Sequence, residues 1–152
     1  MSVPQMPTRW TRTRASSGPG SFGSAYLYYL IPRVILFREE HTRRVMVPRV
    51  DFISAPGTSP PGVYRPGGPY ALLTRLALFR FEREAQQFRL ENVHAGHTLE
   101  EVRDNTGFDF ECPPAVATTP TPEPATLALI RSTIRTEIAE VYPRFAAALA
   151  AA

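Results

Sequence analysis

The chain has 152 residues, of which 43% are hydrophobic and 20% are charged, and its formal net charge is +3 at pH 7. This length fits one domain, and this composition allows a buried core. The single cysteine, Cys112, excludes a disulfide framework and a zinc site built on thiolates. The longest apolar run, 145–152, is too short for a transmembrane helix, and the first residues lack the apolar stretch of a secretory signal. We therefore predict a cytoplasmic protein with no membrane contact.

The positive charge is concentrated near the start of the chain. Residues 1–50 carry eight arginines and two glutamates, a balance of +6, and residues 51–152 carry nine arginines and twelve acidic residues, a balance of −3. Such a basic end suits a nucleic acid, a phosphorylated ligand or an anionic partner, or it reflects a preference of the genome for arginine codons. No nucleic-acid-binding motif accompanies it, so we expect no nucleic-acid partner.

The first half of the chain predicts a few short elements between loops. Residues 1–19 have no periodicity and are predicted to be disordered. A glycine- and serine-rich turn at 20–24 leads into a short helix over 25–30, and a buried strand is expected over 34–37. A second extended stretch is expected over 44–47 and 50–53, interrupted by a proline. Residues 54–69, with five prolines and four glycines, predict a long loop.

The second half predicts a hairpin and then helices. Strands are expected over 70–74, 77–81 and 88–93, and the last two form a hairpin across 82–87. Thr98 and Glu101 have the spacing of a capping box, which begins a helix that ends near 105–107 and turns Leu99 and Val102 to the core. A short extended piece with Phe108 and Phe110 and a proline-rich linker over 113–124 follow. Apolar residues three or four apart predict a helix over 125–141, and Pro143 interrupts it.

These elements predict an α/β domain over 20–142, without internal repeats, and an alanine-rich tail over 143–152. Paired strands alternate with loops, and helices flank them. The chain is too short for a complete doubly wound domain with its own cofactor crevice.

Most of the chemically interesting side chains are predicted to be structural. His94 and His97 have a spacing that suits a metal on a helix, but the intervening Ala-Gly favours a turn, so we predict no metal site. His41 lies among glutamates and arginines and is expected in a solvated charged turn. Cys112 has no basic neighbour in sequence that would activate its thiol, and we predict no catalytic role for it.

The glycine-rich turn is the strongest local candidate for a binding site. It consists of Gly20, Ser21, Phe22, Gly23 and Ser24. A turn of this kind, leading into a helix, presents backbone N–H groups to an anion or to a developing oxyanion.

Four segments, in the same order, resemble the β subunits of family I coenzyme A transferases of the glutaconate CoA-transferase type. The sequence LEEVRDNTGFDF at 99–110 resembles the T-x-E-x-V-x-x-x-T-G-F-D segment of that family, and LIR at 129–131 resembles the end of the helix that follows it. VDFISAPG at 50–57 resembles V-D-[FY]-x-T-S-P-G. The pattern at 67–81, from GGP to LFRF, resembles G-G-P…V-V-T-x-x-x-V-F-x-F.

The resemblance covers about residues 20–135 and implies the C-terminal half of such a subunit. The fold it implies is α/β, a partial open-sheet domain of the β-subunit type with flanking helices. It implies an α-type partner subunit, an acyl-CoA thioester as substrate and no bound cofactor. In the family, a β-subunit glutamate attacks the acyl-CoA, and an anhydride and then a glutamyl-CoA thioester form. A G-x-G-G-A turn, which corresponds here to Gly20–Ser24, supplies backbone N–H groups to the thioester oxygen or to CoA.

The chain departs from the family pattern at two points. The family glutamate lies upstream of the turn, whereas residues 1–19 contain no Asp or Glu, so we expect no catalytic residue in this chain. Phe22 and Ser24 stand where the family has Gly and Ala, and a phenylalanine cannot readily take a positive φ.

Three functions follow as alternatives. The first is a β-subunit-like component of an acyl-CoA transferase that acts in a hetero-oligomer. The second is a subunit of a related hydrolase that opens rings in CoA thioesters of steroid or aromatic degradation. The third is a non-catalytic, truncated remnant.

Overall fold

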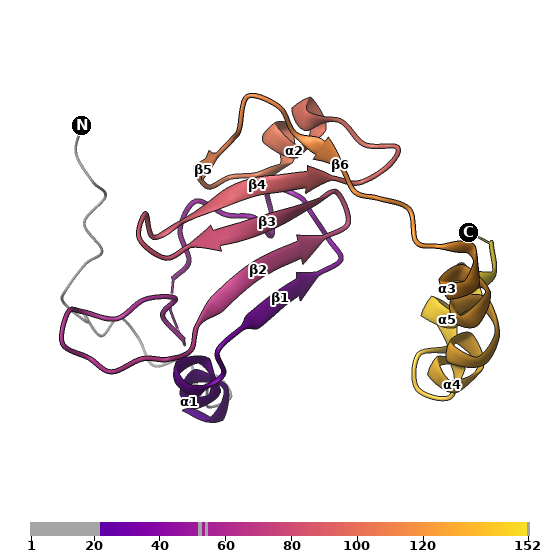
Figure 1. Ribbon diagram of the computed structural model, residues 1–152, viewed down its shortest axis with the longest axis horizontal. Coiled ribbons are helices and arrows are strands. Elements are labelled where there is room, and N and C mark those ends of the chain that lie inside the picture. The colour runs from indigo at the N-terminus through magenta and orange to yellow at the C-terminus, as the bar shows by residue number, and fades with distance from the viewer. Residues whose placement is uncertain (1–21, 52, 54, 152) are drawn as a thin grey trace.

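A six-stranded mixed sheet forms the centre of the molecule, in a computed structural model that describes residues 22–51, 53 and 55–151 (Figure 1). The strands are β1 (Val34–Arg38), β2 (Pro69–Thr74), β3 (Ala77–Glu82), β4 (Gln87–Val93), β5 (Phe110–Glu111) and β6 (Ala117–Thr118). The first five strands are neighbours in chain order. The sixth, β6, pairs with the C-terminal part of β4, whereas β5 pairs with the N-terminal part of β4. The predicted disordered segment 1–19 lies outside the described residues.

The antiparallel strands β2, β3 and β4 form the middle of the sheet, and β3 and β4 form the predicted hairpin. Leu72 pairs with Phe79 between β2 and β3, and Phe79 pairs with Leu90 between β3 and β4. In β3, Ala77 and Phe79 are buried two positions apart and so point to the same face of the sheet, whereas in β4 a shift of register separates the buried Leu90 and Val93 by three positions. The prediction of all three strands is correct to within one residue at each end.

The strand β1 is found where it was predicted, but it is not buried. It pairs in parallel with β2 and is the end strand of the sheet. The side chains of Ile35 and Phe37 are 60% and 67% exposed. The apolar run is typical of a central strand, and these two side chains, which point to the same face, are exposed because no element among the described residues covers that face of β1.

The prediction of an extended stretch is wrong over 44–47, and its second part, 50–53, includes Phe52, which lies outside the described residues. The carbonyl oxygen of Thr42 accepts hydrogen bonds from the N–H groups of Val45 and Met46, at 2.9 Å and 2.8 Å. The chain therefore turns at this point, and Met46 enters the core with only 5% of its surface exposed.

The helix α2 (Leu99–Asn105) covers the core and begins with the predicted cap. The Thr98 hydroxyl accepts a hydrogen bond from the Glu101 N–H at 3.1 Å. Hydrogen bonds from the His97 ring and from the Thr98 backbone help to hold the pKa of Glu101 below its usual value. Val102 is fully buried and Leu99 packs against the same cluster, as predicted.

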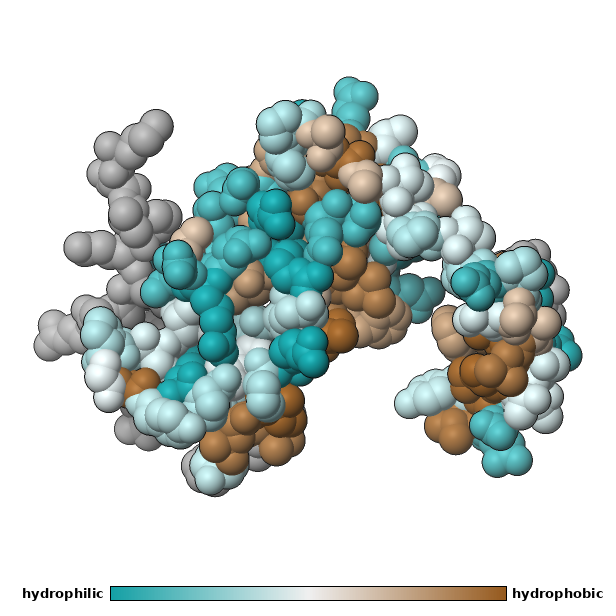
Figure 2. Space-filling model, in the orientation of Figure 1, coloured by the Kyte–Doolittle hydropathy of each residue, from teal (hydrophilic) through white to brown (hydrophobic). Residues whose placement is uncertain are grey.

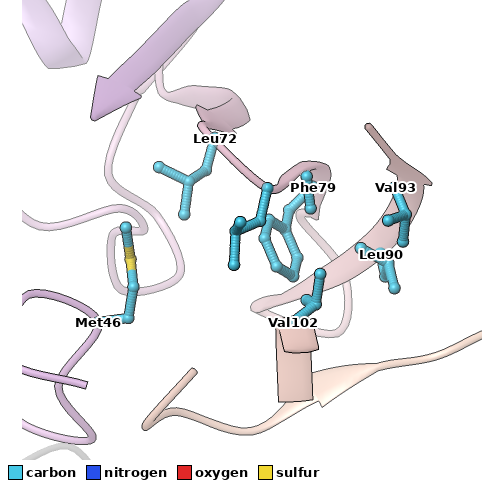
Figure 3. Packing of buried hydrophobic residues seen from close by; sticks show 8 residues of the cluster. Met46, Leu72, Phe79, Leu90, Val93 and Val102 are labelled. Carbon is cyan, nitrogen blue, oxygen red and sulfur yellow. The ribbon is translucent and has the colours of Figure 1, made fainter. Parts of the chain in front are cut away.

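The core lies between the sheet, α2 and the loop that carries Met46 (Figure 3). Phe79 is fully buried at its centre, and its ring packs edge-on against Phe88, Phe108 and Phe110, with centroids 6.4, 6.1 and 5.2 Å away. This aromatic group joins β3 and β4 to the segment after α2, and it adds side-chain contacts to the backbone pairing of the short strand β5 with β4.

The C-terminal helices form a hairpin of their own beyond β6 (Figure 1). One continuous helical stretch consists of α3 (Pro124–Leu129), the π-helical turn η1 (Ile130–Ile134) and α4 (Arg135–Ala139). The chain then turns, and α5 (Pro143–Ala151) packs back on this stretch with Ala146 buried. Pro143 is the first residue of α5, a position where its missing N–H is not needed. No helix in the described part of the chain is long and apolar enough to cross a membrane.

Candidate functional site

Three of the five residues in the predicted glycine-rich turn are helical. Phe22, Gly23 and Ser24 form the first turn of α1 (Phe22–Leu30), which begins three residues earlier than predicted. Gly20 and Ser21 lie outside the described residues. The first N–H groups of a helix have no partner within it, so this turn retains donors for an oxygen atom of a ligand. Its role in binding CoA or a thioester oxygen stays a prediction.

The other end of α1 is joined to the start of β2 by Gly67 and Gly68. The N–H groups of these two glycines donate to the carbonyl oxygens of Tyr29 and Ile31, at 2.8 Å and 3.2 Å. A Cβ atom on Gly67 would lie 2.5 Å from the Ile31 oxygen, so a side chain does not fit there. The GGP motif at 67–69 therefore positions α1, and with it the predicted site.

An arginine in the long loop reinforces this junction. The Arg65 guanidinium lies 4.5 Å from the centre of the Tyr29 ring, which is a cation–π contact. It also donates to the carbonyl oxygens of Gly67 and Tyr28, at 3.0 Å and 3.3 Å. Burial raises the pKa of the nearby Tyr28 phenol, and the charge of Arg65 lowers it. The loop is thus tied to α1 by backbone acceptors and one aromatic ring.

The TGFD motif at 106–109 also has a structural role in this chain. Gly107 donates its N–H to the carbonyl oxygen of Met46 at 2.6 Å, and a Cβ atom at that position would overlap this oxygen. Phe108 packs against Phe79, as described above, whereas Asp109 is exposed. The motif brings the end of α2 against the Met46 loop.

His41 is buried, which corrects the prediction of a solvated charged turn. Only 5% of its surface is exposed, and its ring lies between two hydroxyl groups. Nδ1 is 2.8 Å from the Thr74 hydroxyl oxygen and Nε2 is 2.9 Å from that of Thr106. Each hydroxyl also has a carbonyl oxygen within reach: that of Val102 lies 2.7 Å from the Thr106 hydroxyl, and that of Ala77 lies 3.0 Å from the Thr74 hydroxyl. A neutral ring donates from one nitrogen and accepts at the other, so one of the two hydroxyl groups donates to the ring and the other donates to its carbonyl oxygen.

This burial has an electrostatic consequence. Loss of hydration lowers the pKa of His41, and the nearby charge of Glu101 opposes that change. His41 is therefore uncharged in the folded protein at neutral pH. No local pattern predicted this, because its partners are 33 and 65 residues away in sequence.

The other two histidines do not form a pair. His94 has its ring nitrogens 2.7 Å from the Thr119 hydroxyl and 3.0 Å from the carbonyl oxygen of Thr74. His97 lies 2.9 Å from a carboxylate oxygen of Glu101. Across the residues that the structure describes, no group of three or more His, Cys, Asp or Glu side chains could hold a metal ion.

Cys112 has a basic neighbour that its sequence context did not indicate. Nη2 of Arg103, which is in α2, lies 3.4 Å from the sulfur atom. The thiol is partly exposed and lies 3.7 Å from the carbonyl oxygen of Pro113. The helix brings the two side chains together from nine positions apart.

Similarity to known proteins points to a single family. No protein-family model matches the chain. The β subunit of glutaconate CoA-transferase from Acidaminococcus fermentans is 25% identical over 134 residues, which cover 84% of this chain and 46% of that protein. The β subunit of 3-oxoadipate CoA-transferase from Pseudomonas knackmussii is 30% identical over 105 residues, which cover 65% of this chain and 40% of that protein. The chain spans less than half the length of these two relatives.

Solved structures agree with this similarity. IpdAB from Rhodococcus jostii RHA1 superposes with a TM-score of 0.67 and 25% identity, over 84% of this chain and 52% of that one. Glutaconate coenzyme A-transferase from Acidaminococcus fermentans gives a TM-score of 0.62 and 26% identity, over 74% and 45%. The decarboxylase AibA/AibB gives 0.61 and 28%, over 78% and 45%. The chain is therefore similar in both sequence and fold to the β subunits of the coenzyme A transferase family, over about half of their length.

Proposed function

We propose that this chain is the β-subunit-like component of an acyl-CoA transferase, which acts in the cytoplasm on acyl-CoA thioesters together with an α-type subunit. The two curated relatives are named as CoA-transferases, and each is one subunit of its enzyme. A free-standing activity of this chain is not part of the proposal, because residues 1–19, which precede the glycine-rich turn, contain no Asp or Glu.

One observation carries the need for a partner: α1 and β1 expose an unusual amount of apolar surface (Figure 2). We call this the α1–β1 apolar surface. Its members are each between 42% and 67% exposed, and they are Tyr26, Leu27, Leu30, Ile31, Ile35 and Phe37. Soluble monomers seldom expose large apolar patches, and such patches mark interaction surfaces.

The backbone at the same place supports this argument. The strand β1 is hydrogen-bonded on one side only, to β2, among the described residues. Its outer edge presents unpaired N–H and C=O groups beside Ile35 and Phe37, which is the arrangement that accepts another strand. A strand from a partner chain would satisfy these groups and cover the apolar side chains together.

In the proposed reaction, a carboxylate outside this chain attacks the thioester carbon. CoA leaves as the thiolate and a mixed anhydride forms. The thiolate then attacks the anhydride at the enzyme carbonyl, which releases the first acid and forms an enzyme thioester. In this proposal the turn at Gly20–Ser24 and the start of α1 donate N–H groups to the thioester oxygen, where negative charge develops. The Gly67–Gly68 junction holds α1 in position for this task.

The proposal is tested by co-expression with an α-type subunit from the same genome. The mass of the purified product is measured by size-exclusion chromatography with light scattering. We expect the two chains to form a hetero-complex. CoA should raise the melting temperature of this complex, and the complex should transfer CoA from an acyl-CoA to a free carboxylic acid. Failure of the two chains to associate contradicts the proposal and favours a non-catalytic remnant.

The same assay separates the related activities. Release of free CoA without an acid acceptor is the outcome for a CoA-thioester hydrolase, and release of carbon dioxide is the outcome for a decarboxylase. Either result would contradict the proposed transferase activity but would leave the proposed hetero-complex unchanged.

A further inference from the structure

A small polar pocket lies between the long loop and the hairpin that joins β3 to β4. It has a volume of about 220 Å³. The loop and the hairpin supply its polar wall, which includes Thr58, Ser59, Arg65, Arg83 and Gln86. The lining of the pocket includes none of the described residues of the predicted turn, and neither the family resemblance nor the proposed reaction gives the pocket a role.

Two guanidinium groups meet at one oxygen atom beside this pocket. The carbonyl oxygen of Gly67 accepts hydrogen bonds from Nε of Arg65, at 3.0 Å, and from Nη2 of Arg83. A Cβ atom on Gly68 would lie 3.0 Å from Arg83 Nη2 and 3.6 Å from Arg65 Nε. The absence of a side chain at Gly68 therefore leaves room for the two arginines to converge.

This concentration of positive charge is not neutralised within the described part of the chain. Neither Arg65 nor Arg83 forms an ion pair with any described carboxylate, whereas Arg80 pairs with Glu91 and Arg89 with Glu82. Burial lowers the pKa of Arg65, and the charge of Arg83 also lowers it. Two adjacent like charges without an acid are the electrostatic condition in which an anion binds.

The donors of Arg65 are fixed before any ligand arrives. Its guanidinium rests on the Tyr29 ring and is bonded to Gly67, Tyr28 and Ser59, the last at 3.4 Å. Each of its three nitrogen atoms thus has one partner, and one N–H remains on each Nη. The Ser59 oxygen accepts from Arg65, so the Ser59 proton is free to donate. The Thr58 side chain makes no hydrogen bond to another described residue.

The direction of these donors distinguishes between anions. A planar carboxylate is bound best by two parallel N–H groups of one guanidinium. Arg65 cannot offer that pair from Nε, because Nε is already bonded to Gly67. N–H groups remain on both Nη atoms of Arg65 and on Nε and Nη1 of Arg83, and with the hydroxyl groups of Ser59 and Thr58 they come from both sides of the pocket. Donors from several directions suit the oxygen atoms of a tetrahedral anion.

We propose that this pocket binds a phosphate group, held by Arg65 and Arg83 with the hydroxyl groups of Ser59 and Thr58. The inference goes beyond the proposed function and does not depend on it, because it concerns the chain alone. Inorganic phosphate, pyrophosphate and the phosphates of coenzyme A share this chemistry, and the experiment distinguishes these sources.

The test is titration of the full chain with sodium pyrophosphate and with sodium phosphate. Binding is measured by calorimetry, and the melting temperature of the chain is measured with and without each salt. Sodium chloride at matched ionic strength is the blank. We expect saturable binding and a rise in melting temperature that chloride does not produce. We expect Arg83→Gln to weaken binding at least tenfold. The matched control, Arg49→Gln, removes an exposed arginine that is outside the pocket. This variant should bind pyrophosphate as tightly as the unmodified chain.

A second variant guards against an effect on folding. Thr58→Val removes one donor from a side chain without a hydrogen bond to the rest of the described chain. We expect several-fold weaker binding at an unchanged melting temperature. Equal binding by the Arg83→Gln and Arg49→Gln variants, or no binding beyond the chloride blank, overturns the proposal.

Competition identifies the source of the phosphate. If coenzyme A displaces pyrophosphate and pantetheine, which has no phosphate, does not, the ligand is coenzyme A. If neither competes, the pocket is still a phosphate site, and its ligand is inorganic phosphate or pyrophosphate. These measurements need no α-type subunit, so their result is independent of whether the hetero-complex forms.

Discussion

The Nε2 atom of His41 lies 2.9 Å from the hydroxyl oxygen of Thr106, 65 residues later in the chain. With the Thr74 hydroxyl on the other ring nitrogen, this contact joins the loop after β1, the end of β2 and the end of α2. All three side chains are buried, so each hydrogen bond replaces one that water would otherwise provide. The group closes the domain at the point where the sheet meets α2.

Replacement of Thr106 by valine tests this network. The change keeps the shape of the side chain but leaves Nε2 of His41 and the carbonyl oxygen of Val102 without their partner. We expect a loss of about 1–3 kcal/mol in the free energy of unfolding, measured by urea denaturation. The matched control is Thr118→Val, at an exposed position in β6, which should change stability by less than about 0.5 kcal/mol. Equal effects of the two variants would show that the network adds nothing.

The burial of His41 predicts how stability depends on pH. Its pKa is lowered below 6.5 in the folded protein, so below about pH 6.5 the unfolded chain binds a proton that the folded chain does not. The stability from this residue is complete above pH 6.5 and is lost as the pH falls toward the folded pKa. Urea denaturation between pH 7.5 and 5.5 should show this decline.

The variant His41→Gln provides the comparison for the pH prediction. It is expected to be less stable at pH 7.5 and to lose less stability on acidification. All other side chains are the same in the two proteins, so the difference between their pH profiles isolates the contribution of His41. Parallel pH profiles for the two proteins would contradict the prediction.

Replacement of Gly67 by alanine should release α1 from the start of β2. The added Cβ would lie 2.5 Å from the carbonyl oxygen of Ile31, so the helix end must move. We expect a cost of about 1–3 kcal/mol and faster hydrogen exchange of the amides at the end of α1. In the control, Gly62→Ala, the backbone φ of +85° is unfavourable but nothing lies within 4 Å of the new methyl group. That control should leave exchange in α1 unchanged.

Features determined by near neighbours in sequence were predictable. The central strands β2, β3 and β4 follow from alternating apolar residues and from the turn between them. The capping box follows from two residues three positions apart, Thr98 and Glu101, and the structure has that bond. In both cases the physical partners lie within one element or one hairpin, so a short window of sequence contains the whole interaction.

Features that depend on distant segments were not predictable. The burial of His41 is decided by two threonines far along the chain, and its acidic and basic sequence neighbours pointed instead to solvent. Arg65 and Arg83 belong to a loop and to a hairpin turn, and only the fold brings them to the same carbonyl oxygen. The apolar sequence of β1 predicts a buried strand, but no element among the described residues covers Ile35 and Phe37.

The exposed side chain of Phe37 provides the sharpest test of what covers β1. It is 67% exposed and belongs to the end strand, so Phe37→Asp should hardly change the stability of the chain alone. In a hetero-complex that covers this strand, the same change buries an unpaired carboxylate against apolar groups, which is costly. We expect at least a hundredfold loss of affinity for the α-type subunit, measured by light scattering on mixtures of the two chains.

The matched control for this change is Tyr64→Asp. Tyr64 is 86% exposed and lies in the long loop, away from β1, so this variant should form the complex normally. Normal assembly by both variants would place the partner on another face of the sheet. Loss of assembly in both would mean that added negative charge, and not the β1 surface, weakens the complex. Only a loss confined to Phe37→Asp identifies the end strand as the interface, because it alone removes apolar contact at that position.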